Sequence, residues 1–272
     1  MIQRLKILKM RNSYLLLSLV FILPFNLSAK NITGVSGDVI AVIHTQNTSA
    51  EDLIIKHEQS EYLILGLPYV YQTKFKKIGS IDIEVQHKNF GESRITIKDV
   101  SKVDLSISDQ ARANAEALLI RAAIQSYDTS ISPSFNFTNP VEGIISSRYG
   151  KKRFINDKPR SPHLALDIAA KLGVEISAPL KGKIILTGDF FYTGNTVIMD
   201  HGFGLISSYS HMDSLKVKEG EIIQQNALIG TIGETGRVTG PHLHWTVYLN
   251  KEKINPESLL KDNFLRDLFQ NL

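Results

Sequence analysis

Glycine residues divide the second half of this 272-residue chain into short segments. Thirteen of its eighteen glycines lie between Gly143 and Gly240. They separate short apolar runs, such as Lys183 to Leu186 and Leu228 to Ile232. Frequent turns between short apolar runs predict a compact antiparallel β domain, which we place at residues 140–256.

Residues 30–104 contain a second set of predicted strands. Ile81, Ile83 and Val85 alternate with polar residues, a pattern typical of strands with one buried and one solvated face. We therefore expect a small β-sandwich accessory domain and a mainly β fold class. Three histidines of this segment are interpreted as surface or strand-face residues: His44, His57 and His87.

Residues 105–139 are expected to connect the two β domains as a helix and a linker. Ser106 and Asp109 form a capping pair at the start of the helix. Apolar residues then recur at helical spacing: Ala111, Ala115, Leu118, Leu119 and Ala122. The pattern predicts a helix that packs on one domain and separates the two. A similar apolar pattern in residues 257–272 predicts a terminal amphipathic helix.

The N-terminus is typical of a secretory signal peptide. A basic opening contains Arg4, Lys6, Lys9 and Arg11. An apolar run from Tyr14 to Leu23 follows, then Pro24, and then small residues that would permit cleavage after Ala29. We predict a signal peptide at residues 1–29; the alternative is an uncleaved membrane anchor. Both place the working part of the protein outside the cytoplasm.

Composition limits the possible partners and chemistry. The formal net charge is +4 and the sequence pI is about 9.0, which favours polyanions such as nucleic acid, an anionic membrane or anionic wall polymer. Nucleic acid is the least favoured, because basic residues do not cluster with aromatic ones. Cysteine is absent, which excludes disulfides, a thiol nucleophile, cysteine zinc ligands and a lipid-anchoring cysteine.

Histidine is concentrated in the glycine-rich region. Five of the eight histidines lie between His163 and His244. In the first of three motifs, His163 precedes Asp167 by four residues. Residues an even number apart on a strand face the same side, and Pro162 and Gly173 favour a strand over a helix. One imidazole and one carboxylate on one face would provide two ligands of a zinc site.

The other two motifs place more imidazoles on strand faces. In His242-Leu243-His244, alternation points both histidines to one side and Leu243 to the other. One of the two could bind zinc and leave its neighbour free for proton transfer or charge stabilisation. In the run that ends at His211, alternation places Tyr209 and His211 on one face, from which His211 could reach the same cleft.

Together these motifs favour a catalytic zinc site. Three protein ligands leave the fourth position of zinc to water, whereas structural sites are closed by four ligands. The competing motifs are missing: there is no Gly-x-Ser-x-Gly turn for a serine nucleophile and no His-Glu-x-x-His pair. His201 lies beside a glycine-rich turn and is predicted to make a structural hydrogen bond instead.

The motifs, in this order, resemble the lysostaphin-type (LytM-like) zinc metallopeptidases, a murein endopeptidase family. The resemblance covers about residues 140–256. It rests on Ser146-Ser147-Arg148-Tyr149-Gly150, Pro159-Arg160-Ser161-Pro162-His163, Gly194-Asn195, Asp200-His201-Gly202 and Thr235-Gly236-Arg237-Val238-Thr239-Gly240-Pro241-His242-Leu243-His244-Trp245. The β-rich segment before it resembles an accessory domain of some Gram-negative relatives. The chain departs from the family at Ala165, where glycine is frequent, and at Val174-Glu175, where Thr-Pro is common.

The resemblance implies roles for single residues. His163, Asp167 and His244 match the zinc ligands, and His211 and His242 match two catalytic histidines. The implied protein is a zinc metalloendopeptidase with a lysostaphin-like antiparallel β domain, which hydrolyses peptide cross-links of bacterial peptidoglycan with a metal-activated water. The alternative is a non-catalytic LytM-like module that binds, or activates, other cell-wall hydrolases.

Partners and location follow from the same resemblance and from the N-terminus. The expected partner is the peptide stem of peptidoglycan, and no nucleic acid. The N-terminal domain is a candidate for a regulatory contact with the peptidase groove. Secretion across the inner membrane to the periplasm is expected, with membrane contact only through an uncleaved signal segment.

Overall fold

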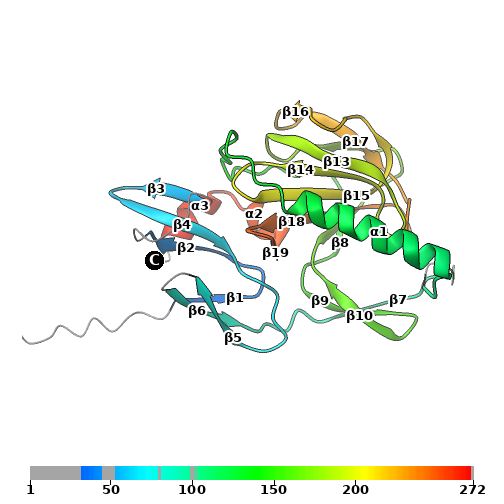
Figure 1. Cartoon of the computed structure of the whole chain (residues 1–272), viewed down its shortest axis with the longest axis horizontal. Coiled ribbons are helices and arrows are strands. Elements are labelled where there is room, and N and C mark those ends of the chain that lie inside the picture. Colours follow the sequence, from blue (N-terminus) through cyan, green and yellow to red (C-terminus); the bar gives the residue numbers. More distant parts are fainter. Residues whose placement is uncertain (1–31, 45–52, 79–80, 99–100, 102, 271–272) are drawn as a thin grey trace, which may run out of the picture. The chain divides into compact units, whose positions relative to one another are not determined.

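The fold of the protein is mainly β, as predicted, in the computed structural model shown in Figure 1. The structure describes residues 32–44, 53–78, 81–98, 101 and 103–270. The predicted signal peptide, residues 1–29, lies outside these residues. Within the described residues, no helix is long and apolar enough to cross a bilayer.

The described N-terminal residues form two small sheets that share one core. The first sheet has the order β1-β6-β5, spanning Ile32–Val35, Ile81–Gln86 and Lys74–Ile78. The second has the order β2-β4-β3, spanning Val39–Ile43, Ser60–Gly66 and Ile54–His57. Ile83 and Val85 of the first sheet pack against Val42 and Leu65 of the second. The period-two alternation therefore identified the buried face of a real β-sandwich.

A ten-stranded antiparallel sheet carries the main core within residues 144–254. Its central path runs β16-β13-β14-β15-β18-β11-β8, with β12 and β17 paired beside it and β19 paired to β18. The strands are β8 (Ile144–Ser147), β11 (Leu166–Ala169), β12 (Glu175–Ser177), β13 (Gly182–Phe190), β14 (Gly194–Asp200), β15 (Leu205–Leu215), β16 (Ile222–Ile223), β17 (Leu228–Ile232), β18 (His242–Leu249) and β19 (Glu252–Ile254). Its core face includes the fully buried Trp245, Tyr209 and Leu166.

A third sheet joins a strand of the N-terminal segment to two strands that precede β11 of the large sheet. Its order is β10-β9-β7, spanning Lys158–His163, Lys151–Ile155 and Glu92–Ile95. The turn between β9 and β10 uses Asn156 and Asp157, both with positive φ, as a tight hairpin turn requires. Strand β7 pairs with β9, so backbone hydrogen bonds join residues on the two sides of the boundary predicted at residue 104. The predicted domain boundaries stay predictions.

Helix α1 spans Ile107–Ile124, and its cap is the one predicted: the Ser106 hydroxyl accepts a hydrogen bond from the Asp109 backbone N–H. The predicted apolar stripe, however, is not the packing face. Leu118 and Leu119 are 63% and 56% exposed. The helix packs on the large sheet through Ile120, Ala123 and Ile124. These residues also recur at helical spacing and form a second apolar stripe.

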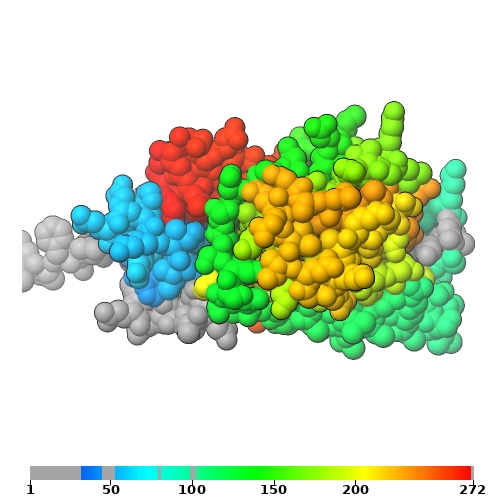
Figure 2. Space-filling model, turned by 90° about the horizontal axis from the view of Figure 1, so that it is seen from above, coloured from blue at the N-terminus to red at the C-terminus, as the bar shows by residue number. Residues whose placement is uncertain are grey.

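The C-terminal segment is helical, but in two pieces: α2 (Pro256–Leu259) and α3 (Phe264–Gln270). The single helix predicted for residues 257–272 was wrong, since Asn263 takes a positive φ between the two pieces. The apolar side chains pack within the chain. Phe269 stacks on His57 of β3, with ring centroids 4.3 Å apart, and Figure 2 shows the red C-terminal residues against the blue N-terminal strands.

Candidate metal and catalytic site

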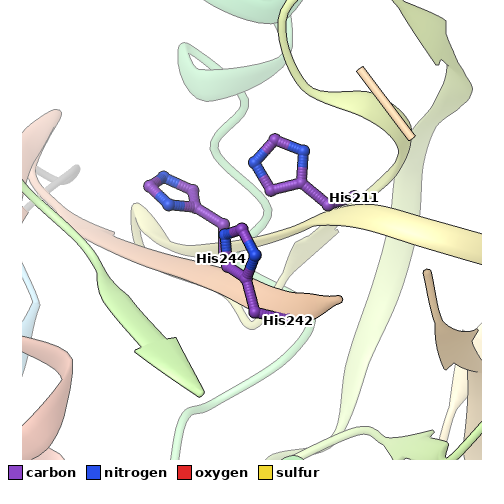
Figure 3. Close-up of side chains that lie close together, drawn as sticks. All are labelled: His211, His242 and His244. Atoms are coloured by element: carbon purple, nitrogen blue, oxygen red, sulfur yellow. The ribbon is translucent and has the colours of Figure 1, made fainter. Parts of the chain in front are cut away.

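The structure brings all five predicted site residues together beside the large sheet. Ligand atoms of His163, Asp167 and His244 lie within 4.8 Å of one another, and so do those of His211, His242 and His244. Figure 3 shows the second group, with His242 and His244 on one strand and His211 on its neighbour. His244 belongs to both groups, so the two clusters form one continuous site.

Strand β18 places its two histidines as the alternation predicted. His242 and His244 point into the site, whereas Leu243 and Trp245 are fully buried in the core on the other face. A strand with this composition has one orientation only, because a one-residue shift would move the indole into the site and both imidazoles into the core.

His163 and Asp167 share a side, although they do not share a strand. Strand β10 ends at His163, and β11 begins at Leu166 after a short break. Asp167 then lies directly opposite His244 in the sheet, which brings the carboxylate to the imidazole. The predicted common face is therefore correct, but the pairing of β11 with β18 produces it rather than a continuous strand.

His211 reaches the site by a different route from the predicted one. Tyr209 lies opposite Trp245 and points into the core, so the predicted common face of Tyr209 and His211 was wrong. The register of β15 against β14 shifts at this point, and His211 has a φ of 66°. This bulge turns the His211 ring to the site side, where its centroid lies 4.9 Å from that of His242.

Backbone carbonyls orient three of the imidazoles. The Nδ1 atom of His163 lies 3.1 Å from the Arg148 oxygen, that of His211 2.9 Å from the Thr235 oxygen, and that of His242 2.8 Å from the Gly240 oxygen. A carbonyl only accepts, so each Nδ1 carries the proton and each Nε2 stays available. Backbone carbonyl partners of this kind cannot be recognised from the residue types.

Thr235 also holds the loop around His211 through its side chain. Its hydroxyl donates to the Met212 oxygen at 2.8 Å and accepts from the Asn195 backbone N–H at 2.9 Å. Gly194 permits this contact: its φ is +58°, and a Cβ there would lie 2.2 Å from the Thr235 hydroxyl oxygen. The Gly194-Asn195 motif is thus explained by close packing around His211.

The electrostatics favour an ionised Asp167 beside His244 and His211, whose pKa values are lowered. Burial would raise the pKa of Asp167, but the charge of His244 and hydrogen bonds from His163 and His244 outweigh it and hold the pKa well below its usual range. Burial lowers the pKa of His244 to about 4. Burial, and then the neighbouring His244 and His242, lower the pKa of His211 well below its ordinary value. This combination of charges suits a divalent cation.

His201 stands outside the site, as predicted. It is fully buried, its Nδ1 lies 2.8 Å from the Lys181 oxygen, and its Nε2 lies 2.7 Å from the Ser207 hydroxyl. Both ring nitrogens are therefore occupied by structural hydrogen bonds, as the sequence indicated.

Comparison with known proteins agrees with this geometry. Peptidase family M23 matches residues 161–256. The peptidoglycan DD-endopeptidases ShyA and ShyB of Vibrio cholerae are 33% identical over 112 residues and 28% identical over 181 residues; the matches cover 41% and 64% of this chain. The matched segments span only 26% of the length of ShyA and 41% of the length of ShyB. A crystal structure from Pseudomonas aeruginosa, assigned to peptidase M23, is 28% identical with a TM-score of 0.64, covering 83% of this chain and 94% of that one.

The matched segment contains all five clustered residues, from His163 to His244. The resemblance seen in the sequence is thereby confirmed, together with the lysostaphin-like β fold. Residues 161–256 of this chain are therefore similar in sequence and fold to Peptidase family M23.

Proposed function

We propose that the protein is a zinc-dependent endopeptidase that hydrolyses peptide cross-links of bacterial peptidoglycan. The main support is the convergence of His163, Asp167 and His244, with two further imidazoles beside them. The names of both Vibrio cholerae relatives, peptidoglycan DD-endopeptidases, support the substrate class. A non-catalytic activator would not need all five side chains, and each of them is present.

The proposed ligands fit a zinc ion in number, chemistry and spacing. Asp167 Oδ1 lies 3.0 Å from His163 Nε2 and 2.7 Å from His244 Nδ1, and these two nitrogens lie 3.4 Å apart. Ligands at about 2.0–2.1 Å from a tetrahedral zinc would be about 3.3 Å from one another. Three ligands of this kind also leave one coordination position for water, which is the catalytic arrangement.

The remaining imidazoles would move protons. When bound, zinc supplies Lewis acidity to the scissile carbonyl and lowers the pKa of a water molecule. The Nδ1–H groups of His211 and His242 donate to backbone carbonyls. The Nε2 atom of each ring is therefore left to accept or donate a proton in the reaction. One would receive the proton of the attacking water, and the other would donate to the oxyanion or to the leaving amine.

The proposed site of action is the periplasm. The predicted signal peptide supports secretion across the inner membrane, and a peptidoglycan substrate would be met there. Membrane contact would then require only an uncleaved signal segment.

Two single substitutions test the proposed roles. His244→Ala should lose zinc, because it removes one of three ligands. His242→Ala should keep zinc and lose about 100-fold or more in turnover, the usual contribution of a general acid or base. Metal analysis and mass spectrometry of defined muropeptides after incubation would measure both effects.

His87→Ala provides the matched control, since His87 is exposed and contacts only the Val70 oxygen through its ring. It should keep both zinc and turnover. Full zinc and full cleavage in both site variants would contradict the assignment. A zinc-loaded wild-type protein that cleaves nothing but stimulates another wall hydrolase would favour the activator instead.

A further inference from the structure

Three arginines lie beside the site and have no role in the proposed reaction. Arg153 in β9 lies directly opposite Arg160 in β10, so the two side chains leave the same face of the hairpin. Arg237 lies near both. Burial lowers the pKa of Arg237, and repulsion from Arg153 and Arg160 lowers it further. We call these three residues the arginine cluster.

Arg153 is the member that interacts electrostatically with the predicted metal ligands. Burial lowers its pKa, whereas the carboxylate of Asp167 raises it, and the charge of Arg153 contributes in turn to the lowered pKa of His244. The guanidinium therefore lies within electrostatic reach of two of the three proposed ligands.

The charge of Arg153 is not compensated by a partner in the described part of the chain. Its Nε atom is buried without a hydrogen-bond partner, and no ion pair joins its guanidinium to a described carboxylate. The Asp167 carboxylate acts on the Arg153 charge through space, but its hydrogen-bond distances, 2.7 Å and 3.0 Å, are to His244 and His163. A partly buried guanidinium with an unpaired Nε can still accept an anion from outside the chain as its partner.

The hairpin fixes the backbone position of Arg153. Strand β9 lies between β7 and β10, with Ser93 of β7 opposite Arg153. The hairpin turn is tied down as well, since the Asn156 side chain accepts from the Ile97 backbone N–H at 2.8 Å and donates to the Ile97 oxygen at 3.1 Å. A group held in this way is preorganised for binding, because little conformational freedom is lost when the ligand arrives.

We propose that the arginine cluster binds a free carboxylate of the wall peptide, next to the scissile amide. The planar fork of a guanidinium matches a carboxylate in two hydrogen bonds, and Arg160 and Arg237 add positive charge. The inference rests on the proposed function and specifies its substrate: a peptide whose amine-side residue has a free carboxylate. A peptide that is neutral at that position would be a poor substrate.

Two synthetic cross-linked peptides that differ only at this group test the proposal. In one, the residue that supplies the leaving amine has a carboxylate; in the other, it has a carboxamide. Zinc-loaded wild-type protein should prefer the carboxylate about 10- to 100-fold in kcat/KM, as expected for a charge-assisted hydrogen-bonded pair. Arg153→Gln should bring this ratio close to one with unchanged zinc content, and Arg153→Lys should restore part of it.

Lys152→Gln is the matched control, because Lys152 is the exposed neighbour on the same strand; it should keep the full preference. Equal wild-type rates on the two peptides, or an equal loss on both in Arg153→Gln, would overturn the proposal. If the wild type cleaves neither peptide, the proposed function fails. Calorimetry then decides the inference alone: tighter carboxylate binding that Arg153→Gln abolishes supports it, and equal affinities overturn it.

Discussion

At the scale of single residues, His201 shows how strongly one buried imidazole is constrained. The ring is neutral in the fold, because Nδ1 donates to the Lys181 carbonyl and Nε2 faces the Ser207 hydroxyl. The hydroxyl oxygens of Ser207 and Tyr209 lie 2.8 Å apart and extend this chain of contacts. Burial lowers the pKa of His201 to about 4.

This shift predicts a pH dependence of stability. Between about pH 6.5 and pH 4 the unfolded chain binds a proton at His201 that the folded protein does not bind. The free energy of unfolding should therefore fall as the pH falls through this range, by about 3 kcal/mol from this residue, and be unaffected by it above pH 6.5. Denaturant unfolding of the wild type and of His201→Gln, both in a chelator, would measure the difference. The same change of unfolding free energy with pH in both proteins would contradict the assignment.

The sequence predicted which side chains come together better than it predicted their surroundings. The alternation in His242-Leu243-His244 predicts which side of the strand faces the core, because the core side chain is apolar and the two site side chains are polar. His211 could not be placed correctly, since its orientation depends on a bulge and a positive φ that the residue types do not reveal. Arg153 was not identified from the sequence, because the pairing of β9 with β7 joins segments far apart in the chain.

At the scale of elements, the start of β14 at Gly194 and the loop that includes Thr235 act as one unit. The Gly194 position touches the Thr235 backbone as well as its hydroxyl, and the Thr235 carbonyl orients the His211 ring. A side chain at Gly194 would push the start of β14 and the Thr235 loop apart. The effect should reach His211 but not the three proposed ligands.

Gly194→Ala should therefore keep zinc and lose turnover. We expect about a 10- to 100-fold lower kcat, since a displacement of about 1 Å in a catalytic group can cost this much. Gly173→Ala is the control: its φ is also positive (+80°), but no atom lies within 4 Å of its added Cβ, so it introduces strain without the clash. A Gly194→Ala protein as active as Gly173→Ala would show that the contact does not position His211.

Element boundaries were predictable where local chemistry sets them. The Ser106 cap begins α1 as expected, because the hydroxyl satisfies a free N–H group. Its packing face was not predictable: Glu116 accepts from the Phe191 backbone N–H at 2.6 Å and, with Ile120, turns the helix away from the Leu118 and Leu119 stripe. Such tertiary contacts decide between two apolar stripes that the sequence presents equally.

At the scale of the whole molecule, the N-terminal segment and the peptidase-like region share one core. Val39 and Ile64 of the second small sheet belong to the same buried cluster as Trp245 of the large sheet. Arg112 of α1 also lines a hollow of about 330 Å³ together with Thr235. These contacts join the second small sheet and α1 to the large sheet, and the predicted regulatory contact of the N-terminal domain with the site stays a prediction.

A chain that begins at Ser130 would test this predicted contact. Removal of the preceding residues takes away β7, α1 and part of the shared core, so the shortened protein should unfold at a lower temperature than the full chain. If the N-terminal part restrains the site, the shortened protein should also cleave muropeptides faster at a temperature where it is folded. Equal activity of the two proteins would count against a regulatory contact.

The central claim is that His163, Asp167 and His244 hold one zinc ion. X-ray diffraction from zinc-loaded crystals, recorded on both sides of the zinc absorption edge, tests it most directly. We predict one anomalous peak, at about 2.0–2.2 Å from His163 Nε2, an Asp167 carboxylate oxygen and His244 Nδ1. A peak elsewhere in the protein, or crystals that exclude zinc while these three side chains keep their positions, would contradict it.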